Sequence, residues 1–198
     1  MPSPVGHALG GLIVALALAP DPRPHEVREV HEGHEGHEGH EARQNDALRV
    51  HRAWLPVVAW CALAACLPDV DFAWGRHNME THSVGFALGL GAATLAWRRS
   101  ARVGLAGTLA VGTHVLFDWL GSDDSPPLGV MALWPFSSEF FFADVWLFAA
   151  ISRRYWQPWF IEQNTLAILR ELAILLPIVV ATWWLAGHAQ STKGTKIN

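Results

Sequence analysis

Residues 103–120 read VGLAGTLAVGTHVLFDWL, an apolar segment that carries two polar side chains near its end. His114 and Asp118 are four residues apart, so on an α-helix they lie on one face, a turn apart. Burying an imidazole and a carboxylate in such a segment costs several kcal/mol unless they pair or bind a metal ion. The pair alone leaves open a hydrogen bond in a helical core or a metal site.

The composition of the chain predicts one domain, residues 1–190, with a long insertion at 20–52 and a flexible tail at 187–198. Its 198 residues are enough to bury a core, and 51% of them are hydrophobic. The net charge is -4 with 14 Lys and Arg, which leaves no basic stripe for nucleic acid. We therefore expect no nucleic-acid partner.

Apolar runs without strand-like alternation predict helices. Ser3 and Pro4 suit the cap and first turn of the first helix, and Ser83 or Thr81 suits the cap of the third. The last run could extend for about 33 Å at 1.5 Å per residue, which is enough to cross a membrane. The fold class expected is all-α, a bundle of about six helices in a multi-pass membrane protein. The predicted helices are 5–19, 53–67, 82–97, 103–120, 138–151 and 165–186.

The insertion at residues 20–52 contains an HEG triplet that occurs three times, beginning at His31, His34 and His37. Glycine at every third residue does not sustain a helix, and without prolines the repeat is not collagen-like. We expect a disordered, charged surface loop. Its imidazoles and carboxylates could also collect zinc or nickel with low affinity.

Polar residues gather at one end of the predicted bundle, because short connections make successive helices antiparallel. The opposite end is expected to hold ten arginines: Arg23, Arg28, Arg43, Arg49, Arg52, Arg98, Arg99, Arg102, Arg153 and Arg154. Cationic short loops stay in the cytoplasm, so the polar end should face the periplasm or the cell exterior. The residues expected at the polar end are His7, Asp69, Asp71, His77, His82, His114, Asp118, Asp123, Asp124 and Glu139.

Imidazole nitrogens and carboxylate oxygens in this number suit zinc, with manganese or iron as alternatives, and suffice for one or two ions. Helix caps or core hydrogen bonds could explain each residue separately, but convergence at one end favours a metal. The predicted ligands are His7, Asp69, Asp71, His82, His114 and Asp118.

The motifs SPVGH, LPDVD, RHNMETHS, THVLFDWL and WPF occur in that order, and the series resembles the YdjM-like family. Its members are described as inner-membrane-associated, metal-dependent hydrolases. The resemblance implies an inner-membrane location and contact with membrane lipid. Family members carry His, Arg and Gly-Pro before Thr-His-Ser, whereas residues 77–80 read HNME here, without the Arg. A distant similarity to helical zinc-dependent phospholipase C and nuclease enzymes implies phosphoester hydrolysis.

The function expected is hydrolysis of a phosphoester or lipid-like substrate, small molecule or lipid, by a metal-activated water. Asp71 or Glu80 would accept the proton of the water, and His77 would protonate the leaving oxygen. A zinc transporter is the alternative favoured by the His-x-x-x-Asp helix and the His-rich loop. A metal-stabilised membrane scaffold without turnover is the third possibility.

Overall fold

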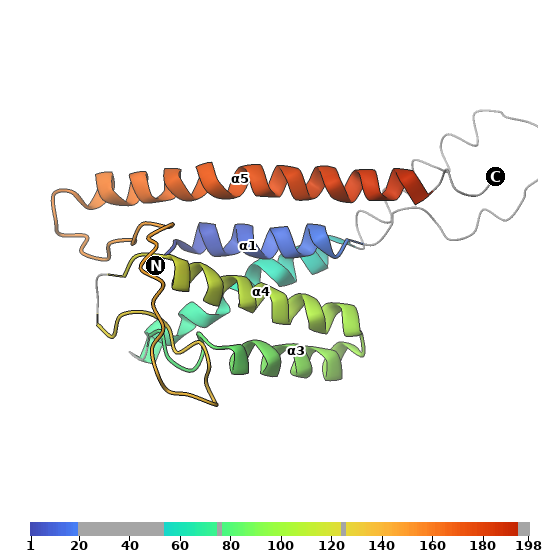
Figure 1. Ribbon diagram of the computed structural model, residues 1–198, viewed down its shortest axis with the longest axis horizontal. Helices are drawn as coiled ribbons and strands as arrows, with labels where there is room; N and C mark the ends of the chain where they lie inside the picture. The colour runs from blue at the N-terminus through green and yellow to red at the C-terminus, as the bar shows by residue number, and fades with distance from the viewer. Residues whose placement is uncertain (20–53, 75–76, 124–125, 194–198) are drawn as a thin grey trace, which may run out of the picture.

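The computed structural model describes residues 1–19, 54–74, 77–123 and 126–193 (Figure 1). The described chain is all-α, as predicted, and contains no strand longer than an isolated bridge. The predicted insertion at 20–52 lies outside the described residues. The elements are α1 (Pro4–Ala17), a helix at 54–66 that continues as the 3-10 helix η1 (Leu67–Trp74), α3 (Val84–Arg98), α4 (Ala101–Leu120) and α5 (Phe160–Lys193).

Serine side chains start three of these helices. Ser3 caps α1 by accepting a hydrogen bond from Gly6 N, and Pro4 occupies its first turn, as predicted. Ser83 caps α3 through Phe86 N, and Ser100 caps α4. Because α3 ends at Arg98 and α4 begins at Ala101, these two helices form a tight antiparallel hairpin.

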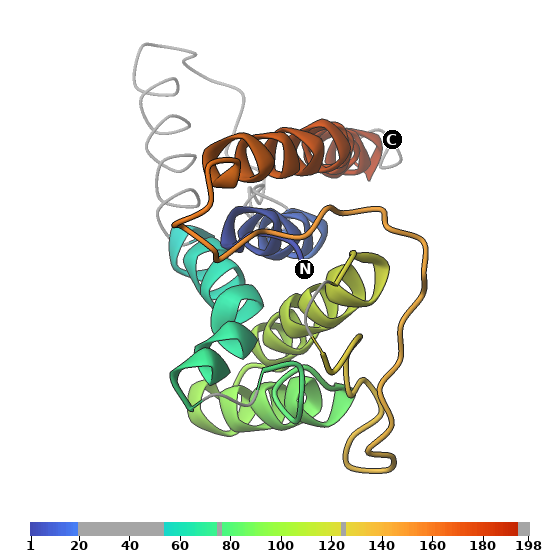
Figure 2. The ribbon, with the colours of Figure 1, turned by 90° about the vertical axis from the view of Figure 1, so that its left-hand side faces the viewer.

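Helix α1 lies at the centre of the bundle, with α5 and α4 on two sides of it and the helix at 54–66 on a third (Figure 2). Small residues allow close contact: a Cβ on Gly11 would lie 2.3 Å from the carbonyl oxygen of Cys61. The core is accordingly built from small side chains, including Ala15, Ala64 and Ala110. Tight packing of this kind fixes which residues face one another at the bundle end.

The predicted helix at 138–151 is wrong. This segment is an extended strap whose backbone pairs with the end of α4 and with the loop that follows it. Leu147 N donates to Leu120 O at 2.8 Å, and Phe141 and Val130 exchange two backbone hydrogen bonds. The bundle therefore has five helical segments over the described residues, and the last begins at Phe160 instead of 165.

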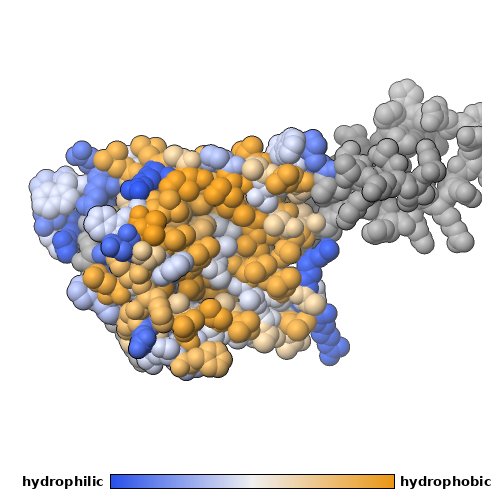
Figure 3. Space-filling model, in the orientation of Figure 1, coloured by the Kyte–Doolittle hydropathy of each residue, from blue (hydrophilic) through white to orange (hydrophobic). Residues whose placement is uncertain are grey.

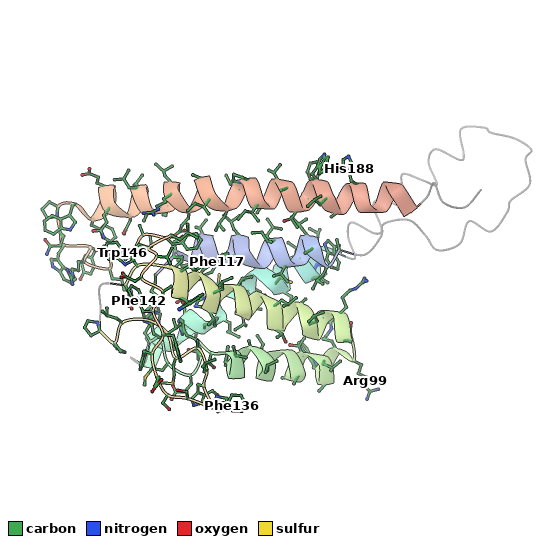
Figure 4. All side chains as sticks on the ribbon, in the orientation of Figure 1. Arg99, Phe117, Phe136, Phe142, Trp146 and His188 are labelled. Atoms are coloured by element: carbon green, nitrogen blue, oxygen red, sulfur yellow. The ribbon has the colours of Figure 1, made fainter. Side chains whose placement is uncertain are left out.

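The strap also changes the predicted charge distribution. Because residues 138–151 do not run back along the bundle, Arg153 stays near the polar end, where its guanidinium lies over the Phe72 ring, 3.6 Å from the centroid. The expected placement of Arg153 and Arg154 at the opposite end is therefore wrong. Arg99 does lie at that opposite end, far from Phe117 and Phe136 (Figure 4).

Three helices are long and apolar enough to cross a membrane: Trp54–Ala73, Ala101–Leu120 and Phe160–Ala186. Their outward faces carry exposed large apolar side chains; Leu63, for example, is 69% exposed. In Figure 3 apolar residues cover the middle of the visible face, and hydrophilic residues gather toward its two ends. This distribution is typical of a surface in contact with lipid.

Candidate metal centre

Seven polar side chains from four segments meet at one end of the bundle. Helix α1 contributes one, η1 contributes two, the turn before α3 contributes two and α4 contributes two. This convergence agrees with the end predicted from helix alternation. The residues are His7, Asp69, Asp71, His77, His82, His114 and Asp118.

Asp118 lies at the middle of the inner part of the cluster. Its Oδ1 is 3.4 Å from His7 Nε2, and its Oδ2 is 3.0 Å from His114 Nε2 and 3.4 Å from His82 Nε2. All four side chains are at most 1% exposed. None of the five ligand atoms just named has a hydrogen-bond partner in the described chain. Buried nitrogen and oxygen atoms without hydrogen bonds lower the stability of the fold unless a cation lies among them.

His114 shows why a hydrogen bond does not explain the inner cluster. Its Nδ1 lies 2.6 Å from the carbonyl oxygen of Ala65, which only accepts, so Nδ1 carries the proton. The Nε2 of the neutral ring then presents a lone pair to the Asp118 carboxylate at 3.0 Å. Two acceptors this close require a proton or a metal ion between them.

A second group lies nearer to the surface and consists of Asp69, His77 and His82. Asp69 Oδ1 is 3.7 Å from His82 Nε2 and 3.9 Å from His114 Nε2, so it connects the outer and inner groups. The Asp69 side chain is 22% exposed and that of His77 15%, so this part of the cluster is partly exposed to solvent. Together the two groups provide ligand atoms for one or two ions.

Asp71 uses both of its oxygens within the cluster. Oδ1 accepts from His77 Nδ1 at 2.9 Å, and Oδ2 accepts from the Thr81 hydroxyl at 2.7 Å and lies 3.2 Å from His82 Nδ1. Carboxylates that hold metal-binding histidines by their second nitrogen fix ring orientation and tautomer. The arrangement suits Asp71 as an orienting group for two histidines.

The carboxylates control the charge of His82. Burial of this ring disfavours its cation, but Asp69 and Asp71, followed by Asp118, favour it and raise its pKa to about 9. Without a metal ion, the cluster therefore holds a proton on His82 at neutral pH. A metal ion bound to His82 would have to displace that proton.

Other residues expected at this end are not part of the cluster. Glu80 is half-buried and belongs to neither metal-ligand group; its backbone carbonyl accepts from the Ser83 hydroxyl. Asp123 accepts hydrogen bonds from Asn78 Nδ2 and Gly129 N, so it orders the neighbouring loop. Glu139 is exposed on the strap, and Asp124 lies outside the described residues.

Two polar partners at this end of the bundle were not predicted from the sequence. Thr81 binds Asp71, although its position suggested only a helix cap. Glu171 on α5 is fully buried and binds Ser3 at the start of α1. The sequence did contain a feature that could have identified Glu171: it is a carboxylate inside an apolar run long enough to span a membrane, and such a group is usually functional or paired.

A model of the YdjM inner membrane protein family matches residues 1–192. No curated protein and no solved structure matches the chain. The family match includes every segment that contributes to the cluster, from His7 on α1 to Asp118 on α4. The chain therefore belongs to the YdjM family of inner membrane proteins.

Proposed function

We propose that this protein is a membrane-bound hydrolase that depends on a divalent metal and acts on phosphoester or lipid-like substrates. One observation carries the proposal: His7, His82, His114 and Asp118 present buried ligand atoms to one another without hydrogen-bond partners. Imidazole and carboxylate donors in this number fit zinc, with manganese or iron as alternatives. One or two ions would be held.

The residues divide into an inner and an outer ligand set. His7, His114 and Asp118 would hold the inner ion. Of the outer group, which also contains His77, Asp69 and His82 would bind at the more exposed side. A bound divalent ion lowers the pKa of a coordinated water and polarises the group to be cleaved. The open side near Asp69 is where a substrate would reach the cluster.

The Asp71 and His77 pair would move the proton. Asp71 holds His77 by Nδ1 at 2.9 Å, and His77 Nε2 has no hydrogen-bond partner in the described chain. A histidine held by a carboxylate in this way can accept a proton at Nε2 and return it to a leaving oxygen. We assign His77 the proton transfer and Asp71 its orientation; the geometry favours Glu80 less, because it lies outside both ligand groups.

The surroundings of the cluster support a substrate at the membrane surface. Exposed aromatic side chains gather at this end: Phe136 is 89% exposed, and Trp146 is 58% exposed (Figure 4). Aromatic side chains of this kind sit at the level of lipid headgroups. The opposite end carries Arg98, Arg99 and Arg102, which favours an orientation with the cluster toward the periplasm or exterior.

The position of the cluster favours a hydrolase over a transporter. Its residues lie in the first turn of α1, within the short η1, in the turn before α3 and in the last two turns of α4, instead of being spread along the helices. An ion path would need polar groups at several depths of the bundle. A non-catalytic scaffold would use the same ligands but would not need His77 to transfer a proton.

The test is metal analysis of the purified protein in detergent, followed by a screen of phosphoester and acyl-ester substrates. Asp118→Asn should weaken zinc binding by about 10–100-fold, whereas His77→Gln should keep the metal and lose turnover. Asp123→Asn, at the same bundle end but outside the cluster, is the matched control and should change neither. Absence of metal would refute the site. A protein that binds metal but cleaves no substrate would favour the scaffold. Uptake of zinc into liposomes that contain the protein would favour the transporter.

A further inference from the structure

We infer that Glu171 on α5 is a positioning residue for His7, and that it fixes this ligand through the first turn of α1. The inference rests on the proposed metal centre, because it concerns one of that centre's ligands. It gives a role to α5, a helix that supplies no residue to the cluster. It also explains a fully buried carboxylate that the proposed reaction does not use.

Glu171 binds the residue that begins α1. Its Oε1 accepts a hydrogen bond from Ser3 N at 2.6 Å, and its Oε2 accepts one from the Ser3 hydroxyl. The Ser3 oxygen in turn accepts from Gly6 N at 3.2 Å. A carboxylate at a helix N-terminus is further stabilised by the helix dipole. The start of α1 is therefore tied to α5 by charged, buried hydrogen bonds.

His7 depends on this tie more than the other histidines do. The rings of His77, His82 and His114 each have a hydrogen-bonded or close polar partner at Nδ1, namely Asp71, Thr81 and the Ala65 carbonyl. His7 Nδ1 has no hydrogen-bond partner in the described chain, and its Nε2 faces only Asp118 Oδ1, at 3.4 Å. Apart from this contact the ring is held by stacking, with centroid distances of 3.7 Å to His114 and 6.4 Å to Phe117, so no group fixes its second nitrogen. The position of His7 is thus set by its backbone.

The backbone of His7 leads directly to Glu171. His7 N donates to Ser3 O at 3.1 Å, which closes the first helical turn on the residue that Glu171 holds. Gly6 completes the unit, because a Cβ at that position would lie 2.8 Å from Glu171 Oε2. The motif SPVGH therefore combines a cap, a glycine that admits the carboxylate and a ligand.

The first experiment measures metal binding with cobalt as the probe. Glu171→Ala should weaken Co²⁺ binding by about 10–100-fold and alter the visible absorption of the bound ion, because the ligand at His7 is displaced. Glu171→Gln keeps one acceptor and should show a smaller change. Leu175→Ala is the control: it removes a buried side chain one turn further along α5 and should lower thermal stability while leaving the cobalt spectrum unchanged.

The second experiment does not require metal. Diethyl pyrocarbonate modifies accessible histidines, and mass spectrometry of peptides locates the product. His7 is fully buried and should be protected in the wild type, but should become reactive in Glu171→Ala and partly reactive in Ser3→Ala. His114, held by Ala65, should stay protected in both.

The two measurements separate the possible failures. If the wild type binds no cobalt, the proposed metal centre is wrong, and the labelling result alone decides the role of Glu171. If the wild type binds cobalt and Glu171→Ala changes neither the spectrum nor the labelling of His7, the positioning role is wrong. Equal reactivity of His7 and His114 in Glu171→Ala would indicate general loosening of the fold and would also overturn it.

Discussion

The side chains of the cluster hold charge that a cation must balance. Three carboxylates, Asp69, Asp71 and Asp118, surround His82, and two of them are almost fully buried. A proton on His82 supplies part of the balance when no metal is present. Protons and metal ions therefore compete for the same place, and pH should affect the two states in opposite directions.

We predict that the metal-free protein becomes less stable as the pH rises. The pKa of His82 is about 9 in the folded protein, against an ordinary value of 6.5, so the folded state binds the proton more tightly. The contribution of this proton to the free energy of unfolding is fully present below pH 6.5 and is lost as the pH passes through 9. This contribution is on the order of 3 kcal/mol. The measurement is the thermal unfolding midpoint of chelator-treated protein between pH 6 and 10.

The control for this pH effect is His188, an exposed histidine on α5 whose ring lies against Trp184, with 3.9 Å between the ring centroids. His82→Gln should flatten the pH dependence, whereas His188→Gln should keep it. With saturating zinc the unfolding midpoint should instead rise with pH, because the ligands must lose protons to bind the metal. A His82→Gln protein with the wild-type slope would contradict the assignment.

The residues of the site could be predicted further than their roles. Helix spacing brought His114 and Asp118 to one face, and the alternation of helices placed His7 and His82 beside them. The contact that orients His114 could not be predicted, because it involves the backbone carbonyl of Ala65, which no side-chain pattern reveals. The partner of Glu171 could not be predicted for a related reason: Ser3 is 168 positions away in the chain.

Among the elements, the crossing of α1 with the helix at 54–66 controls how closely the cluster can assemble. The carbonyl of Ala65, which orients His114, comes from the same helix that meets Gly11 at the Cys61 carbonyl. A larger side chain at this crossing would separate the two helices. The histidines of α1 and α4 would then lose their common support.

We predict that Gly11→Ala destabilises the protein by about 1–3 kcal/mol, because its Cβ would lie 2.3 Å from a backbone oxygen that cannot move freely. Gly112→Ala is the matched control: it is also a helical glycine, but nothing lies within 4 Å of an added Cβ. It should raise stability by up to about 1 kcal/mol. Chemical unfolding in detergent measures the free energy of unfolding of both variants. Equal changes would show that α1 and the helix at 54–66 are not closely packed at Gly11.

The strap at 138–151 shows which elements a sequence pattern cannot distinguish. Its residues, SEFFFADVWLFAAI, are apolar enough for a buried helix, but the run is rich in aromatic side chains with modest helix propensity. The extended form is stabilised by long-range backbone pairing, such as Ser122 N to Phe148 O at 2.8 Å. By contrast, α4 matched its prediction closely because its small and aliphatic residues favour one structure.

The whole molecule has two chemically different ends separated by an apolar middle. From Trp159 to Trp183 is 24 residues, or about 36 Å of helix, close to the distance between the headgroup regions of a bilayer. Both tryptophans are more than half exposed. These features favour α5 as a complete span with an aromatic side chain at each interface.

We predict that the cluster end faces away from the cytoplasm. Single cysteines would be introduced by Ser138→Cys at the cluster end and Ala101→Cys at the arginine end, in a chain with Cys61→Ala and Cys66→Ala. A membrane-impermeant thiol reagent added to intact cells should label the first and not the second. Labelling of the second alone would place the cluster in the cytoplasm.

We also predict that the His-rich repeat does not belong to the metal centre. The insertion follows α1 and precedes residue 54, and both of these points lie at the end of the bundle opposite the cluster (Figure 1). Deletion of residues 31–41 should leave the unfolding midpoint and the metal content at saturating zinc unchanged. Loss of the bound metal on deletion would contradict this and would favour a transporter.

The unequal exposure of the two ligand groups sets an order for metal exchange. An ion held by Asp69 and His82 would have partly exposed ligands, whereas an ion held by His7, His114 and Asp118 would be enclosed by buried ones and would leave past the outer position. We expect a chelator to remove the outer ion first and the inner one much more slowly. A protein that keeps only the inner ion could then be prepared, and its outer position could be filled with a different metal. With a different metal at each position, the effect of each ion on the reaction could be measured separately.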